Sequence, residues 1–88
     1  MSPVEETLTL LDLTGIACVI SRKPGSAIIT PVRGMQVLLC ELDDGLVEVI
    51  YEQPLGDARE ECEPARAAAI VGLILSRKQL EQVTLPRG

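Results

Sequence analysis

The chain contains no histidine, phenylalanine or tryptophan, and Tyr51 is its single aromatic residue. Nucleophilic catalysis by cysteine or serine usually requires a nearby base, most often histidine, so the absence of histidine weakens that mechanism. A core without aromatic rings must be filled by leucine, isoleucine, valine and alanine. We therefore predict a non-enzymatic domain without catalytic residues, metal ligands or a cofactor.

Cysteine is scarce and has no metal-binding spacing. The three cysteines, Cys18, Cys40 and Cys62, form no C-x-x-C motif, and an odd number argues against a disulfide framework. Cys62 has Glu60, Glu61 and Glu63 as neighbours in the sequence, and negative charges oppose formation of the reactive thiolate. We predict that all three thiols are free and structural, in a reducing cytoplasmic compartment.

Long apolar runs and an excess of basic charge are also missing. The longest apolar run, residues 67–75, covers nine residues, whereas a membrane-spanning helix needs about 20. The first residues are acidic and lack the basic start of a signal peptide. Eight basic residues stand against thirteen acidic ones, for a net charge of −5. Because nucleic acids and anionic membranes attract basic proteins, we expect neither as a partner.

What the chain does have is aliphatic content. Hydrophobic residues make up 47% of 88 residues, which predicts one folded domain over residues 1–88. A domain of this size buries a small core, and such chains often gain stability by associating with another subunit. A homodimer is therefore part of the prediction.

The N-terminal segment has a helix start signal. Ser2 can cap a helix, Pro3 suits its first position, and Glu5 completes a capping box, while Thr14-Gly15 is a plausible end. Alternation in residues 7–10 also fits a strand, so both interpretations of residues 4–13 stay open. Farther along, Pro64 predicts the start of a second helix that reaches roughly residue 83.

Between the helices we predict four strands, with residues 53–63 as a connector. A wholly apolar run at residues 16–20 predicts a buried strand, and Pro24-Gly25 predicts a type II turn into residues 27–30. Asp44-Gly45 predicts a two-residue hairpin turn between residues 35–42 and 46–52. The result is an α+β two-layer sandwich: a four-stranded antiparallel meander with both helices on one face.

The fourth predicted strand has one apolar and one mixed face. Its alternation places Val47, Val49 and Tyr51 together, whereas Glu48 and Glu52 share the opposite face with Leu46 and Ile50. The mixed face is only half polar, which indicates that something covers part of it. The pattern does not decide which face the helices cover.

Acidic residues are concentrated in the middle of the chain. Residues 41–63 contain nine acids and one base, for a net charge of −8. The segment is interpreted either as an acidic docking surface for a basic partner or as an ordinary solvated hairpin and loop. Under the first interpretation its candidate partner-binding residues are Glu48, Glu52, Asp57, Glu60, Glu61 and Glu63.

The C-terminal helix is apolar around its circumference at residues 67–75, so it needs cover on two sides. The sheet can supply one side, and the N-terminal helix, a second subunit or a partner the other. Small residues at helical spacing permit close approach of another helix. The candidate contact residues here are Ala68, Gly72 and Leu75.

These features predict a small acidic protein-interaction module that dimerises or docks on a protein partner. The element order and the segment Ile50–Asp57 look like those of the small acidic dimeric chaperones of bacterial type III secretion, although this chain is much shorter; the resemblance implies a chaperone-like or adaptor role. One alternative is an acidic inhibitor, of the phage or mobile-element type, that blocks a basic surface of a host protein. The other is a small-ligand binder or enzyme.

Overall fold

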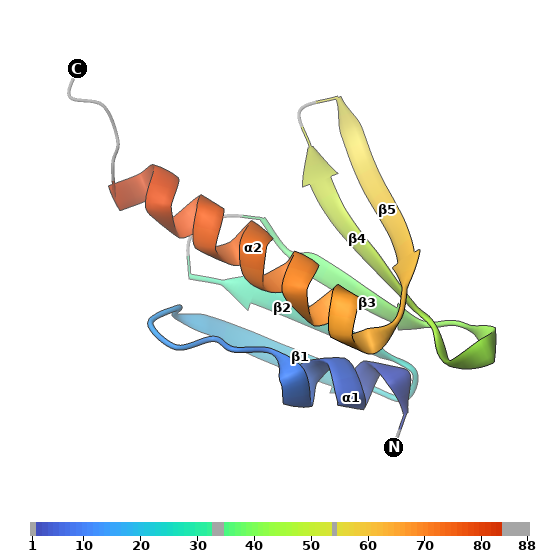
Figure 1. Cartoon of the computed structure of the whole chain (residues 1–88). Coiled ribbons are helices and arrows are strands. Elements are labelled where there is room, and N and C mark those ends of the chain that lie inside the picture. Colours follow the sequence, from blue (N-terminus) through green and yellow to red (C-terminus); the bar gives the residue numbers. More distant parts are fainter. Residues whose placement is uncertain (1, 33–34, 54, 84–88) are drawn as a thin grey trace.

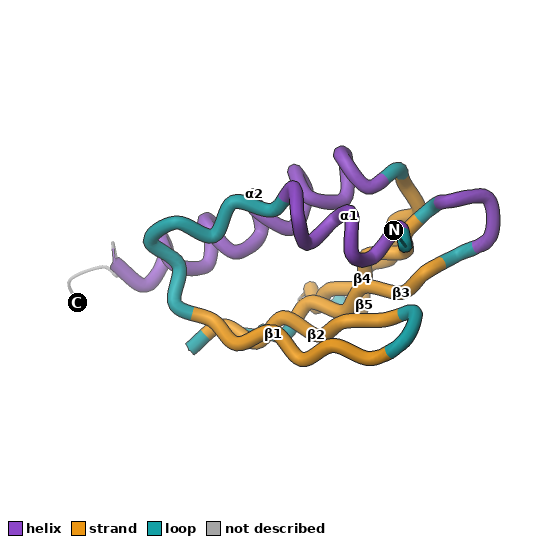
Figure 2. The backbone as a smooth tube through the Cα atoms, turned by 90° about the horizontal axis from the view of Figure 1, so that it is seen from below, coloured by secondary structure: helices purple, strands orange, loops and turns teal. Residues whose placement is uncertain are grey.

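The computed structural model describes the backbone of residues 2–32, 35–53 and 55–83, and side chains as far as Ser76. It is an α+β fold in which one antiparallel sheet has both helices on the same side (Figures 1 and 2). The elements are α1 (Pro3–Leu10), β1 (Cys18–Lys23), β2 (Ser26–Pro31), β3 (Val37–Glu41), the short 3-10 turn η1 (Asp43–Gly45), β4 (Val47–Gln53), β5 (Gly56–Cys62) and α2 (Pro64–Val83). The predicted two-layer class is confirmed.

The sheet has five strands in the order β1-β2-β3-β4-β5, so the prediction of four strands was wrong. The segment interpreted as a connector contains β5, which pairs with β4 from Val47↔Cys62 to Gln53↔Gly56. Asp57, Arg59, Glu60 and Glu61 give this strand a composition poor in β-formers. Pairing with the β-branched residues of β4 outweighs that weak local preference.

α1 begins as predicted and ends earlier than predicted. The Ser2 hydroxyl accepts a hydrogen bond from the Glu5 backbone N–H at 3.2 Å, which is the expected N-terminal cap. Residues 3–10 are helical, so the strand interpretation of this segment was wrong. The helix stops at Leu10, before Gly15, because Leu11 is already extended.

Both predicted hairpin turns are present, and the connection between β3 and β4 is longer than predicted. Gly25 has a φ of +77°, as the second central residue of a type II turn requires. Between β3 and β4 the connection spans residues 42–46, with the three-residue 3-10 turn Asp43–Gly45 at its centre, in place of the two-residue turn predicted. Asp44 and Gly45 both have positive φ, which explains the choice of aspartate and glycine there.

The core lies between the helices and the inner face of the sheet. Its sheet side includes Ile29, Val37, Leu39, Val47 and Val49, all fully buried. From the helices, Val4 of α1 and Ala67, Val71 and Leu75 of α2 complete the cluster. The three α2 residues are spaced by four, so they form one stripe of the helix that faces the sheet.

The first strand of the sheet differs from its prediction in both burial and position. Residues 16–20 were expected to form a buried strand, whereas β1 runs from Cys18 to Lys23 at an edge of the sheet. Val19 is 67% exposed because it points away from the helices and has a neighbouring strand on one side only. An apolar run alone does not distinguish a central strand from an edge strand.

Candidate functional site: the uncovered face of the sheet

The sheet has one face that no described helix covers (Figure 2). Adjacent residues of a strand point to opposite faces, so neighbours of the buried residues point away from the helices. The strand register aligns Ile28 with Leu38 and Leu38 with Ile50. These three side chains form an apolar row across β2, β3 and β4, and each is partly exposed. We call them the apolar row.

Polar residues flank the apolar row on both sides. On one side, the register aligns Lys23, Ser26, Cys40, Glu48 and Glu61. On the other, the Gln36 side-chain amide donates a hydrogen bond to the Thr30 hydroxyl at 3.2 Å, and Glu52 is aligned with Asp57. The uncovered face therefore combines a central apolar strip with polar margins, as the core and rim of many protein interfaces do.

Two pairs of carboxylates lie directly opposite each other on β4 and β5. The register aligns Glu48 with Glu61 and Glu52 with Asp57, and like charges in such positions destabilise a sheet. Arg59, which is aligned with Ile50 between them, lies 3.6 Å from the Glu48 carboxylate. Among the described residues, no cation forms an ion pair with Glu52 or Asp57.

A shallow hollow lies at the end of the apolar row beside this second carboxylate pair. Its lining includes Met35, Gln36, Leu38 and Ile50, with Glu52 and Asp57 at the same place. The hollow is open to solvent, and none of the described residues that line it is basic. It can hold an apolar group next to a positive charge.

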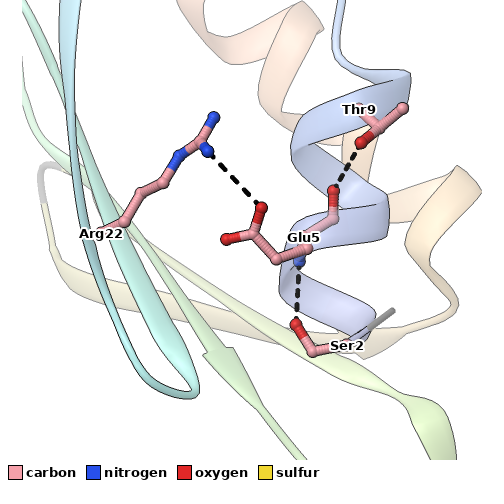
Figure 3. A network of polar contacts seen from close by, with 4 residues as sticks. All are labelled: Ser2, Glu5, Thr9 and Arg22. Carbon is pink, nitrogen blue, oxygen red and sulfur yellow. Dashed lines mark hydrogen bonds and ion pairs between the residues drawn. The ribbon is translucent and has the colours of Figure 1, made fainter.

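The two edges of the sheet are protected against pairing with another strand. On β1, Arg22 points toward the helices and forms an ion pair with Glu5 of α1 at 3.5 Å (Figure 3). On β5, Glu60 also points toward the helix side and is half-buried. Inward-pointing charges on edge strands discourage edge-to-edge association. The face of the sheet is thus better suited to docking than its edges.

The helices leave a second, open groove along α1 and α2. It is lined by Leu10, Asp12, Ala65, Ala68, Ala69, Gly72, Leu73 and Ser76. Leu73 is 62% exposed. A β-carbon added at Gly72 would meet nothing within 4 Å, so this glycine is not required for close packing inside the chain. The sheet and α1 cover two sides of α2, as expected. The stripe of α2 that lines this groove is left open to solvent.

The predicted partner-binding residues fall into five groups in the structure. Glu48, Glu52, Asp57 and Glu61 are brought together on the uncovered face, whereas Glu60 points to the opposite face. Glu63 is exposed between β5 and α2. Gly72 and Ala68 both line the helix groove, and Ala68 is only 7% exposed there. Leu75 is 2% exposed and belongs to the core, so we leave it out of the candidate surfaces.

Sequence reasoning missed most of the apolar row. The alternation in residues 46–52 indicated that Ile50 shares a face with Glu48 and Glu52. The same alternation in β2 and β3 was available for Ile28 and Leu38, but aligning them with Ile50 requires the register.

The cysteines show no arrangement for catalysis among the described residues. All three are free, and Cys62 is buried. Burial raises the pKa of the Cys62 thiol, the Glu60 carboxylate raises it further, and Arg66 acts in the opposite direction. The thiol is therefore held in its neutral form, which is the less nucleophilic one. In the described part of the chain, no three cysteine or acidic side chains are grouped closely enough to hold a metal ion.

Comparisons with known proteins give no relative. No protein-family model, no curated protein and no solved structure matches this chain. The resemblance to type III secretion chaperones gains no support from them. No helix within the described residues is long and apolar enough to cross a membrane.

Proposed function

We propose that this chain is a small, non-enzymatic protein-interaction module that docks a protein partner on the uncovered face of its sheet. The observation that carries the proposal is the apolar row of Ile28, Leu38 and Ile50, aligned across three adjacent strands on the face opposite the helices. Apolar side chains that line up across a sheet face provide a continuous surface for a partner to cover.

The chemistry of the chain supports a binding role over a catalytic one. There is no histidine, and the buried thiol of Cys62 has a raised pKa. Three free thiols fit a cytoplasmic, reducing environment, which is part of the proposal. An adaptor or chaperone and an acidic inhibitor would both use the uncovered face. They differ in how much of the binding free energy comes from the apolar row and how much from the carboxylates.

The test compares two surfaces by removing one leucine from each. Tagged wild-type protein, Leu38→Thr and Leu73→Gln are produced in the native cells, captured and analysed for a stoichiometric partner. Threonine suits a strand and glutamine a helix, so both variants should fold. We expect one partner with the wild type and Leu73→Gln, and its loss with Leu38→Thr. Loss of the partner with Leu73→Gln but not with Leu38→Thr would contradict the proposal, and so would the absence of any partner with the wild type.

Self-association through the helix groove is a second candidate function. It is favoured by Leu73, which is 62% exposed beside Ala69 and Gly72. The same helix thus offers a protruding leucine and small residues to receive one, as a twofold symmetric interface requires. Sedimentation over a range of protein concentrations tests it: a dimer that Gly72→Leu dissociates supports this candidate, and a monomer throughout eliminates it.

A further inference from the structure

We propose that the segment recognised by the uncovered face combines apolar and basic side chains. Its apolar side chains cover Ile28, Leu38 and Ile50, and its basic side chains lie over the β4–β5 end of the sheet. This inference rests on the proposed function and adds the chemistry of the partner. It is argued from the distribution of charge around the apolar row.

Charge on the uncovered face is divided between its two ends. The outward-facing residues of β4 and β5 include four acids and one base, whereas the only charged residue facing outward from β1 and β2 is Lys23. A partner in contact with the apolar row therefore meets negative charge at one end only. Complementary charge fixes the orientation of a partner as well as increasing its association rate.

The carboxylates of Glu52 and Asp57 are the most suitable contact for a cation. They are aligned on neighbouring strands, both are exposed, and no described cation pairs with them. Glu48, by comparison, already has Arg59 at 3.6 Å. A basic side chain placed between Glu52 and Asp57 would reduce the repulsion between them.

The hollow beside this pair suits the shape of a basic side chain. Met35, Leu38 and Ile50 line it next to Glu52 and Asp57. Lysine and arginine have apolar stems that lie along apolar surface while their charged ends reach polar groups. The same position can therefore bury the stem and pair the charge.

A second copy of the chain is a poorer occupant of this face. Among the described strand residues, the charged side chains that point outward are Lys23 and Arg59 against Glu48, Glu52, Asp57 and Glu61, and these six sum to a net charge of −2 on each copy. Two such faces brought together repel each other. Nucleic acids and anionic lipids are disfavoured by the same charge, which leaves a basic protein segment as the complementary partner.

The test uses the purified full-length chain and short synthetic peptides as probes. One fluorescent peptide alternates leucine with lysine, a second alternates leucine with glutamate, and a third alternates serine with lysine. Fluorescence anisotropy measures the affinity of each. We expect the leucine–lysine peptide to bind most tightly, and its affinity to fall at high salt, where the Debye length shrinks from about 8 Å to about 3 Å.

Matched variants distinguish binding at Glu52 and Asp57 from a general attraction of the acidic chain for a basic peptide. Glu52→Gln with Asp57→Asn should weaken binding of the leucine–lysine peptide by roughly twofold to thirtyfold, the range for two exposed ion pairs. Glu6→Gln with Asp43→Asn removes the same charge from exposed positions elsewhere and should leave the affinity nearly unchanged. Leu38→Thr should weaken binding, whereas Leu73→Gln should not.

Equal effects of the two double variants would overturn the inference, because binding would then depend on overall charge. Failure of the leucine–lysine peptide to bind more tightly than the other two would overturn it as well. A dimer that dissociates in Leu38→Thr would assign the face to a second copy and reject the basic segment. The cell-capture comparison of Leu38→Thr with Leu73→Gln judges the proposed function separately, since it requires no basic partner.

Discussion

Leu38 and Leu39 provide a matched test of whether the sheet has one covered and one uncovered face. They are the same residue type at adjacent positions of β3. Leu39 is 0% exposed and packs in the core under the helices, whereas Leu38 is partly exposed on the other face. Replacing each with alanine removes the same atoms from two different environments.

The expected loss of stability differs because only Leu39→Ala leaves a cavity. For a fully buried leucine, the lost transfer free energy and the cavity together cost about 3–5 kcal/mol. At Leu38, water fills the space that the side chain vacates, so only part of the transfer free energy is lost, about 1–2 kcal/mol. Leu39→Ala should therefore destabilise the protein by at least about 1 kcal/mol more than Leu38→Ala.

Urea unfolding followed by circular dichroism measures both values. Small proteins lose about 1–3 kcal/mol of stability per molar urea, so Leu39→Ala should lower the midpoint by roughly 1 M or more. If Leu39→Ala does not fold, Leu39→Val and Leu38→Val replace the pair. Equal losses of stability at the two positions would refute the reasoning, because they would show that the outer face is covered in the isolated protein.

Three further substitutions test separate parts of the structure. Ser2→Ala removes the cap of α1 and should lower the free energy of unfolding by about 1 kcal/mol; an unchanged urea midpoint would argue against the cap. Gly72→Ala should raise stability by about 0.5–1 kcal/mol, because alanine favours helix and its β-carbon meets no atom within 4 Å; destabilisation that depends on protein concentration would instead indicate an interface there. For Cys62, the raised pKa means that the unfolded chain releases the thiol proton first, so stability should fall as the pH rises above 9.0, the ordinary thiol value. Unfolding measured across that range should show a shallower fall for Cys62→Ala than for the wild type, and parallel curves would contradict the assignment.

Local signals in the sequence predicted the elements whose cause is local. The capping box at Ser2, the turn at Pro24-Gly25 and the positive-φ positions Asp44 and Gly45 each depend on a few neighbouring residues. β5 was missed because its stability as a strand comes from pairing with β4, which no local pattern records.

The candidate site was predicted only in part, because alternation within one strand can be seen in the sequence and the register between strands cannot. Alternation placed Glu48 and Glu52 beside Ile50, and this grouping needs only one strand. The apolar row and the opposed pair of Glu52 and Asp57 need the register between strands, and the pair also needs β5. Gly72 and Leu75 were assigned to one surface because residues 67–75 are apolar around the helix and small residues recur at helical spacing, whereas their burial depends on the rotation of α2 against the sheet.

The most direct test of the central claim uses Cys40 as a natural reporter on the uncovered face. Cys40 is aligned with Ser26 and Glu48 beside the apolar row and is partly exposed, whereas Cys18 lies on the helix side of β1. The captured complex and the free protein are alkylated under identical conditions, and each cysteine is quantified by mass spectrometry. We predict that the partner protects Cys40 and leaves the labelling of Cys18 unchanged. Labelling of Cys40 at the same rate in the complex and in the free protein would show that the partner binds elsewhere.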